Sequence, residues 1–246
     1  MKSRRFILVF ALIVTGIATL FYLLHFLLFR DADYIMKDLL TQLAFMPVFY
    51  FLSTMILDNI IAKRDRITRK RKLNMLVGLF FNEFGSQLIQ QIGTFEEDFA
   101  TVRNRLLVTD SWKESQFAEA RSFLGTHSWQ TSTQGGNLEE LRDYLLSHRA
   151  FLVTTLENQY IQEHEAFSEL LLALFHLCDE LKLRTDFGTL PKADVTHLAG
   201  DIRRVSGLLF VEWLNYIEHL KTEYPYLFSL AIRTSPFVSE KAVIIR

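Results

Sequence analysis

The sequence predicts an all-α protein with an N-terminal transmembrane helical hairpin followed by a cytoplasmic helical bundle domain. Two long apolar segments lie within the first 61 residues, and a dense basic run follows them. In the remaining chain, apolar residues recur with helical spacing and few segments alternate with period two. These observations predict three parts: an anchor over residues 1–62, a basic juxtamembrane linker over 63–72, and an acidic all-helical domain over 73–246.

The two apolar segments are each long enough to cross a bilayer. Residues 6–29 would form a helix of about 36 Å, and residues 39–61 contain a second apolar run between Asp38 and Asp58. A cleaved signal peptide is the alternative for the first segment. Its apolar core would be about twice the usual length, and no A-x-A cleavage site follows it. We therefore expect two membrane spans.

The distribution of basic residues predicts the orientation of these spans. Lys2, Arg4 and Arg5 precede the first span, whereas the connecting loop has only Arg30 and Lys37. By the positive-inside rule both termini lie in the cytoplasm, and we expect a multi-pass protein of a bacterial inner membrane. Seven basic residues after the second span are expected to contact lipid headgroups. They are Lys63, Arg64, Arg66, Arg69, Lys70, Arg71 and Lys72.

Charge and cysteine content exclude several classes of ligand. Residues 1–72 carry 12 basic and 5 acidic side chains, whereas the remainder carries 15 and 23. An acidic domain repels nucleic acid, so we expect no nucleic-acid partner. Cys178 is the only cysteine, which excludes an intrachain disulfide and a cysteine-rich metal site. No Walker A, dinucleotide or kinase signature is present, so we expect no nucleotide.

The domain is predicted to begin with the apolar segment 73–95, which we expect to pack in the core, with the membrane surface as the alternative. Further helices are predicted at residues 110–124, 137–158, 161–184 and 192–223, and a short element ends near residue 237. Loops are expected at residues 126–137, where Asn137 is a candidate helix cap, and at residues 186–194.

Histidines and carboxylates form stripes on the last two long helices. At 100° per residue, Glu165, Glu169, His176 and Glu180 fall within about 60° on one helix. On the next helix, His197, Asp201, Glu212, Asn215, His219 and Glu223 fall within about 80°. Helical bundles bind paired iron or manganese ions with such ligands. The candidate metal ligands are His176, Glu180, His197, Asp201 and His219.

A simpler interpretation competes with the metal site. The first stripe lies opposite the apolar face of its helix, where side chains usually meet solvent. The Glu-x-x-His spacing of carboxylate bundles is absent, and pairs four residues apart are also common surface contacts. His148 and His164 lie on or beside apolar faces, so we expect buried histidines that hydrogen-bond to backbone carbonyls or carboxylates.

Three stretches resemble a family of uncharacterised bacterial two-span membrane proteins: KLNMLVGLFFNEFG at 72–85, EHEAFSELLLALFHLCDEL at 163–181 and EWLNYIEHLKTEYPYLFSLAIRTSPF at 212–237. The resemblance implies no activity, catalytic residue or cofactor. The first hypothesis is a non-enzymatic interaction or signalling module that binds a protein partner or a second copy of itself. The alternative is a di-iron or manganese bundle with an oxidoreductase activity. The third hypothesis is a pH or lipid sensor that uses the basic linker and His148.

Overall fold

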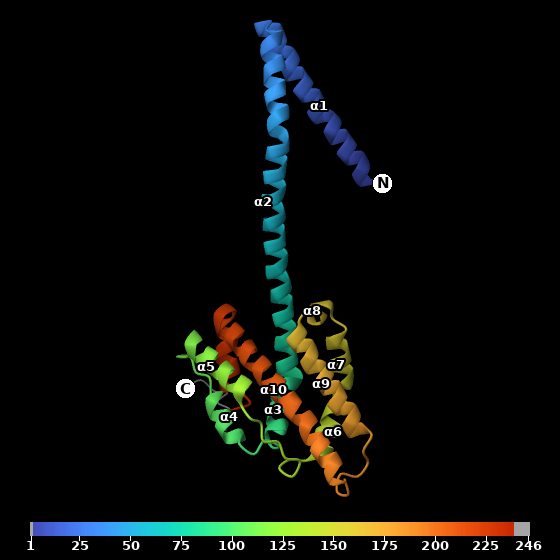
Figure 1. Ribbon diagram of the computed structural model, residues 1–246, viewed down its shortest axis with the longest axis vertical. Helices are drawn as coiled ribbons and strands as arrows, with labels where there is room; N and C mark the ends of the chain where they lie inside the picture. Colours follow the sequence, from blue (N-terminus) through green and yellow to red (C-terminus); the bar gives the residue numbers. More distant parts are fainter. Residues whose placement is uncertain (1, 239–246) are drawn as a thin grey trace. The chain divides into compact units, whose positions relative to one another are not determined.

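The computed structural model describes residues 2–238, and all of its regular elements within that range are helical. The chain divides into two compact units at Arg66 and Ile67. The helices are, in order, α1 (Lys2–Phe29), α2 (Ala32–Phe80), the π-helical turn η1 (Phe81–Gly85), α3 (Ser86–Gly93), α4 (Phe99–Arg105), α5 (Glu114–Thr126), α6 (Leu138–Ser147), α7 (Arg149–Leu156), α8 (Gln159–Gln162), α9 (Glu165–Lys182), α10 (Lys192–Glu223) and α11 (Pro225–Arg233) (Figure 1).

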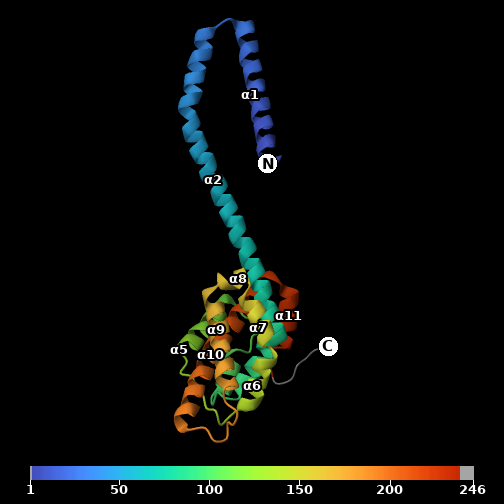
Figure 2. The ribbon, with the colours of Figure 1, turned by 90° about the vertical axis from the view of Figure 1, so that its right-hand side faces the viewer.

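The first unit is a helical hairpin made by α1 and the first part of α2 (Figure 2). Arg30 adopts a positive φ of 51° at the turn, and the Asp31 side chain accepts a hydrogen bond of 2.9 Å from the backbone N–H of Tyr34 in the first turn of α2. Two segments, Val9–Phe29 and part of the helical run Ala32–Gly93, are long and apolar enough to cross a membrane by length and composition. None of their most apolar windows is buried.

The basic run after the second apolar segment contains no glycine or proline and continues the helix without a break. α2 extends to Phe80, where the helix widens into η1. The segment 73–95 packs in the core, as expected. Its buried residues are Val77, Phe80, Phe81, Phe84, Leu88, Ile89, Ile92 and Phe95.

The second unit is built around α10, which contacts α3, α5, α9 and α11 (Figure 1). The predicted apolar faces of α9 and α10 are confirmed. On α9 the buried face includes Phe167, Leu170, Leu171, Leu174, Leu177 and Leu181, and on α10 it includes Leu198, Ile202, Leu209, Trp213, Ile217 and Leu220. Burying these side chains is the main force that holds the bundle together.

Two expectations about helix boundaries are wrong. The single helix predicted over residues 137–158 is broken at His148 into α6 and α7, and the short helix α8 follows. The helix α4 was not predicted, because its seven residues are too few to show a clear period. Asn137 caps α6 as expected, since its side chain accepts hydrogen bonds of 3.0 and 3.1 Å from the backbone N–H groups of Glu139 and Glu140.

Candidate metal centre

Two histidines and two carboxylates meet where α9 and α10 lie side by side. His176 and Glu180 are four residues apart near the end of α9, and His197 and Asp201 are four residues apart near the start of α10. Residues four apart share one helix face. The short connection over residues 183–191 folds the chain back, so the two faces meet.

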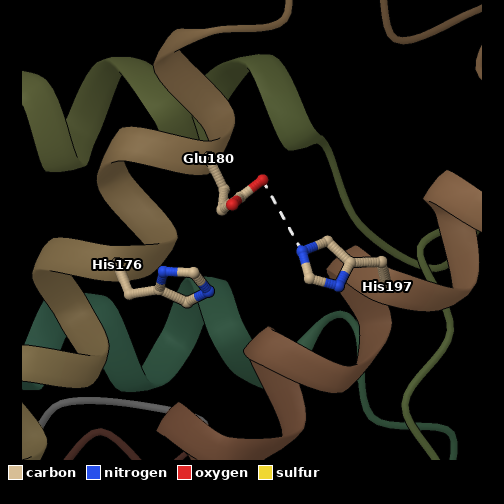
Figure 3. A group of neighbouring side chains, drawn as sticks. All are labelled: His176, Glu180 and His197. Carbon is tan, nitrogen blue, oxygen red and sulfur yellow. Dashed lines mark ion pairs between the residues drawn. The ribbon is translucent and has the colours of Figure 1, made fainter.

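The side chains of His176, Glu180 and His197 point toward one another (Figure 3). Nε2 of His176 lies 3.4 Å from Oδ1 of Asp201, and Nε2 of His197 lies 3.3 Å from Oδ2 of the same carboxylate. Oε2 of Glu180 lies 3.6 Å from Nε2 of His197. One potential ligand atom each from His176, Glu180 and His197 lie within 4.8 Å of one another.

These separations match the spacing of ligands around a small metal ion. Zinc binds imidazole nitrogen and carboxylate oxygen at about 2.0 to 2.2 Å in tetrahedral sites, which places neighbouring ligand atoms about 3.3 to 3.6 Å apart. The contacts of 3.3, 3.4 and 3.6 Å between histidine nitrogens and carboxylate oxygens lie in that range. The ligand atoms of His176, Glu180 and His197 together spread over up to 4.8 Å, so a bound ion would draw them closer to one another.

Asp201 is the least exposed member of the cluster. Its side chain is 8% exposed, whereas those of His176 and His197 are 46% and 50% exposed. Oδ2 of Asp201 is buried, and no described residue gives it a well-aligned hydrogen bond, although it approaches His197. A buried carboxylate oxygen without a partner is costly, and a cation or a protonated imidazole would offset this cost.

An arginine clamp borders the cluster. Arg184 donates hydrogen bonds of 2.7 Å to Oε2 of Glu180 and to Oδ2 of Asp194, and so joins the end of α9 to the start of α10. These hydrogen bonds hold the pKa values of Glu180 and Asp194 below their usual range. Glu180 is therefore ionised at neutral pH, but an incoming metal ion must share it with Arg184.

Two sequence models match the chain: "MJ1433, N-terminal helical domain" over residues 2–61, and "Uncharacterized protein MJ1433, C-terminal helical domain" over residues 69–233. The "Uncharacterized protein MJ1433" of Methanocaldococcus jannaschii is 40% identical over 244 residues, which cover 99% of this chain and 98% of that protein. The chain belongs to the MJ1433 family. No solved structure matches it.

The MJ1433 family agrees in part with the family that the sequence was expected to resemble. The expectation of an uncharacterised family is met, because the names of these relatives give no activity. The expectation of bacterial origin has no support, since the relative that is 40% identical comes from an archaeon. The family descriptions name two helical domains, in agreement with the all-helical structure.

His219 does not join the metal cluster, so its inclusion among the candidate ligands is wrong. It lies 18 residues after Asp201 on the same uninterrupted helix, a rise of about 27 Å. Its Nδ1 lies 3.1 Å from Nδ2 of Asn74 instead. The helical angle places His219 on the same stripe as Asp201, but the rise along the axis puts it near the other end of α10.

His148 and His164 are half-buried at helix ends. Nδ1 of His148 lies 2.9 Å from the backbone carbonyl oxygen of Tyr144, the kind of partner that we expected. His164 has a different role, because its Nδ1 accepts a hydrogen bond of 3.1 Å from the backbone N–H of Phe167 and caps α9. Both imidazoles therefore stabilise helix ends.

Some residues of the basic run contact protein in the second unit. Arg69 pairs with Glu163 at 3.0 Å, and Lys72 donates a hydrogen bond of 2.8 Å to the hydroxyl of Tyr160. Lys63 and Arg66 lie exposed in the first unit. Arg69 and Lys72 would have to give up these contacts in order to bind lipid headgroups.

The sequence did not predict the burial of two carboxyl groups, those of Glu96 and Glu212. Glu96 is 4% exposed and accepts hydrogen bonds from Ser206 at 2.6 Å and from Thr131 at 2.9 Å. Glu212, also 4% exposed, accepts one from Asn215 at 3.2 Å. Burial raises the pKa of both carboxyl groups. The apolar neighbours of Glu212 on α10 were the available signal, whereas Glu96 gave none, because its partners are 35 and 110 residues away.

Proposed function

We propose that the helical domain binds one divalent transition-metal ion between α9 and α10. The observation that carries this proposal is the convergence of two imidazole Nε2 atoms on the buried carboxylate of Asp201, with Glu180 beside them. Two histidines with one or two carboxylates are a ligand set that zinc, iron and manganese accept.

The ligand count favours a single ion over the paired ions of carboxylate bundles. Those bundles use four glutamates and two histidines, whereas His176, Glu180 and His197 are the one group of potential ligands found in the part of the chain that the structure describes. Asp201 would have to shift to become a fourth donor, because its Oδ1 lies near His176 and its Oδ2 near His197. Imidazole nitrogens and carboxylate oxygens are ligands that zinc accepts.

Bound metal would join the two helices that form the centre of the domain. His176 and His197 are about half-exposed, so an ion there would be reached by water or by a small external ligand. Protonation of the two imidazoles would satisfy the same carboxylate without a metal. An experiment must therefore distinguish a bound metal ion from ion pairs between protonated imidazoles and the carboxylate.

The test is metal content and zinc titration of the full chain, purified in mild detergent without a histidine tag. We expect about one ion per chain, and we expect His176→Ala and His197→Ala each to lower the affinity about tenfold to a hundredfold. His219→Ala is the matched control, because it removes a histidine about 27 Å along α10 from the cluster. Equal zinc binding by all four proteins would refute the proposal.

We further propose that α1 and the first part of α2 anchor this domain in a membrane with both termini cytoplasmic. The support is the length and composition of the two helices, their exposed apolar side chains and the excess of basic residues at their outer ends. The core helix of a soluble protein would be buried, whereas these windows are not. Release of the chain from membranes by alkaline carbonate would contradict this anchor.

A protein-interaction module is the second candidate. An apolar groove of about 680 Å³ lies in the second unit between α2, α10 and α11. Met75 and Leu79, one turn apart on α2, are 70% and 49% exposed beside it. Exposed apolar patches of this kind favour a partner that offers an apolar helix face, and a second copy is the simplest one. Met75→Glu should then abolish self-association in detergent, and a wild-type chain that is monomeric at all concentrations would contradict a dimer.

A further inference from the structure

A second, separate site is formed by a polar cleft at the other end of α10. The cleft has a volume of about 710 Å³ and lies between α2, α5, the cap of α9 and the last turns of α10. All of its lining residues belong to the second unit. Ligand sites commonly have volumes of about 300 to 1,000 Å³, so the cleft can hold a small molecule.

Glu212 is the buried acid of this cleft. It lines the cleft although it is only 4% exposed. Its Oε1 accepts a hydrogen bond of 3.2 Å from Nδ2 of Asn215, and Oδ1 of Asn215 is in turn held by Arg121 at 3.2 Å. No residue in the described range hydrogen-bonds to Oε2 of Glu212. The carboxylate therefore has an oxygen to offer a ligand.

No lysine or arginine of the described residues forms an ion pair with the Glu212 carboxylate. Burial raises the pKa of Glu212, and the nearby His164 and the hydrogen bond from Asn215 oppose this effect. Arg121 pairs with Glu218, and Nζ of Lys221 donates to the backbone oxygen of Asp110. A buried carboxylate without a counter-charge is costly, and a cationic ligand would offset that cost.

Charge and shape together indicate the class of ligand. Four carboxylates line the cleft, those of Glu114, Glu212, Glu218 and Glu223. Glu218 pairs with Arg121, so three carboxylates remain against two lysines. Glu212 and Glu223 lie about 16 Å apart along α10, too far for one inorganic ion to bridge. Apolar side chains also line the cleft, namely those of Leu73, Val77 and Phe117. A lining with both charged and apolar side chains suits a chain of ammonium groups and methylenes.

We propose that this cleft binds a linear aliphatic polyamine, with one ammonium group paired to Glu212 at the base and another paired to Glu223 at the rim. His219 also lines the cleft, and its buried Nε2 has no hydrogen-bond partner among the described residues. Because Nδ1 accepts from the amide group of Asn74, a neutral His219 carries its proton on Nε2, where it disfavours an ammonium group.

The test is calorimetric titration of the full chain in detergent with spermine, after treatment with a chelator. We expect saturable binding at one site, and Glu212→Gln should weaken it about tenfold or more, because it removes a charge-assisted hydrogen bond and keeps the shape. Glu169→Gln is the matched control, since Glu169 is exposed on α9 and does not line the cleft. It should bind spermine as the wild type does.

Two further measurements keep the proposal falsifiable. Glu223 is exposed at the rim, so Glu223→Gln should fold normally and weaken binding severalfold, even if Glu212→Gln does not fold. His176→Ala should leave spermine affinity unchanged, which separates this site from the metal cluster. The proposal would be overturned if spermine did not bind, or if Glu223→Gln and the wild type bound it with equal affinity. It would also be overturned if magnesium, added at the same total positive charge as the spermine, displaced it.

Discussion

Replacing Asp201 by asparagine should have opposite consequences with and without metal. The side chain is 92% buried and faces two imidazoles, with one oxygen lacking a well-aligned hydrogen bond. Asparagine keeps the size and removes the charge. Without metal, we expect the free energy of unfolding to change by less than about 1 kcal/mol or to rise, because a buried charge is lost. With metal, the variant loses the ligand that both histidines approach.

The magnitude follows from binding linkage. At a free zinc concentration one hundred times the dissociation constant, the wild-type domain gains about 2.7 kcal/mol of stability. A tenfold loss of affinity lowers this gain to about 1.4 kcal/mol, and a hundredfold loss lowers it to about 0.4 kcal/mol. For a domain of this size, each kcal/mol changes the melting temperature by about 2–4 °C. Zinc should therefore raise the wild-type Tm by about 5–11 °C and the variant Tm by about 1–6 °C.

The assay is thermal unfolding of both proteins, chelated and zinc-loaded, followed by circular dichroism. Glu169→Gln is the control for loss of a negative charge, because it is exposed on α9. A wild-type Tm that does not respond to zinc would refute the metal site. An equal zinc-induced rise in the wild type and in Asp201→Asn would refute the role of Asp201 as a ligand.

Three other changes test the structure. Gly85→Ala should lower the free energy of unfolding by about 1–3 kcal/mol in denaturant titration, because an added Cβ would lie 2.6 Å from one buried phenylalanine ring and 2.7 Å from another. Glu212→Gln in the ligand-free protein should raise the denaturation midpoint at pH 8 and have no such effect at pH 4. Burial raises the pKa of Glu212, so the folded state loses stability as pH rises through that pKa, and glutamine removes this loss. Arg184→Ala should destabilise the metal-free protein, because its partners Glu180 and Asp194 lose their hydrogen bonds, and should strengthen zinc binding, because a competing cation is gone. Unchanged or weaker zinc affinity in that variant would contradict the competition.

The sequence was sufficient for features that depend on local repetition. Apolar spacing predicted long helices where α9 and α10 lie, and their apolar faces are buried. Asn137 was recognised as a cap because capping involves only neighbouring residues. The break at His148 was missed, because the apolar stripe of Leu141 and Leu145 continues past it to Leu152.

Which polar side chains meet was decided by the tertiary structure. The angle around the helix axis placed His197, Asp201 and His219 on one stripe. That angle takes no account of the distance along α10, which separates His219 from the other two. His197 and Asp201 lie at the end of α10 where α9 brings His176 and Glu180 close to them. The sequence alone shows that two polar residues lie four apart near the end of α9 and two more lie four apart near the start of α10. The turn at residues 183–191 determines that these pairs face each other, and the packing of α2 against α10 determines that Glu212 is buried at a cleft. Periodicity is a property of one helix, whereas a site requires the separation between helices, which only the folded chain fixes.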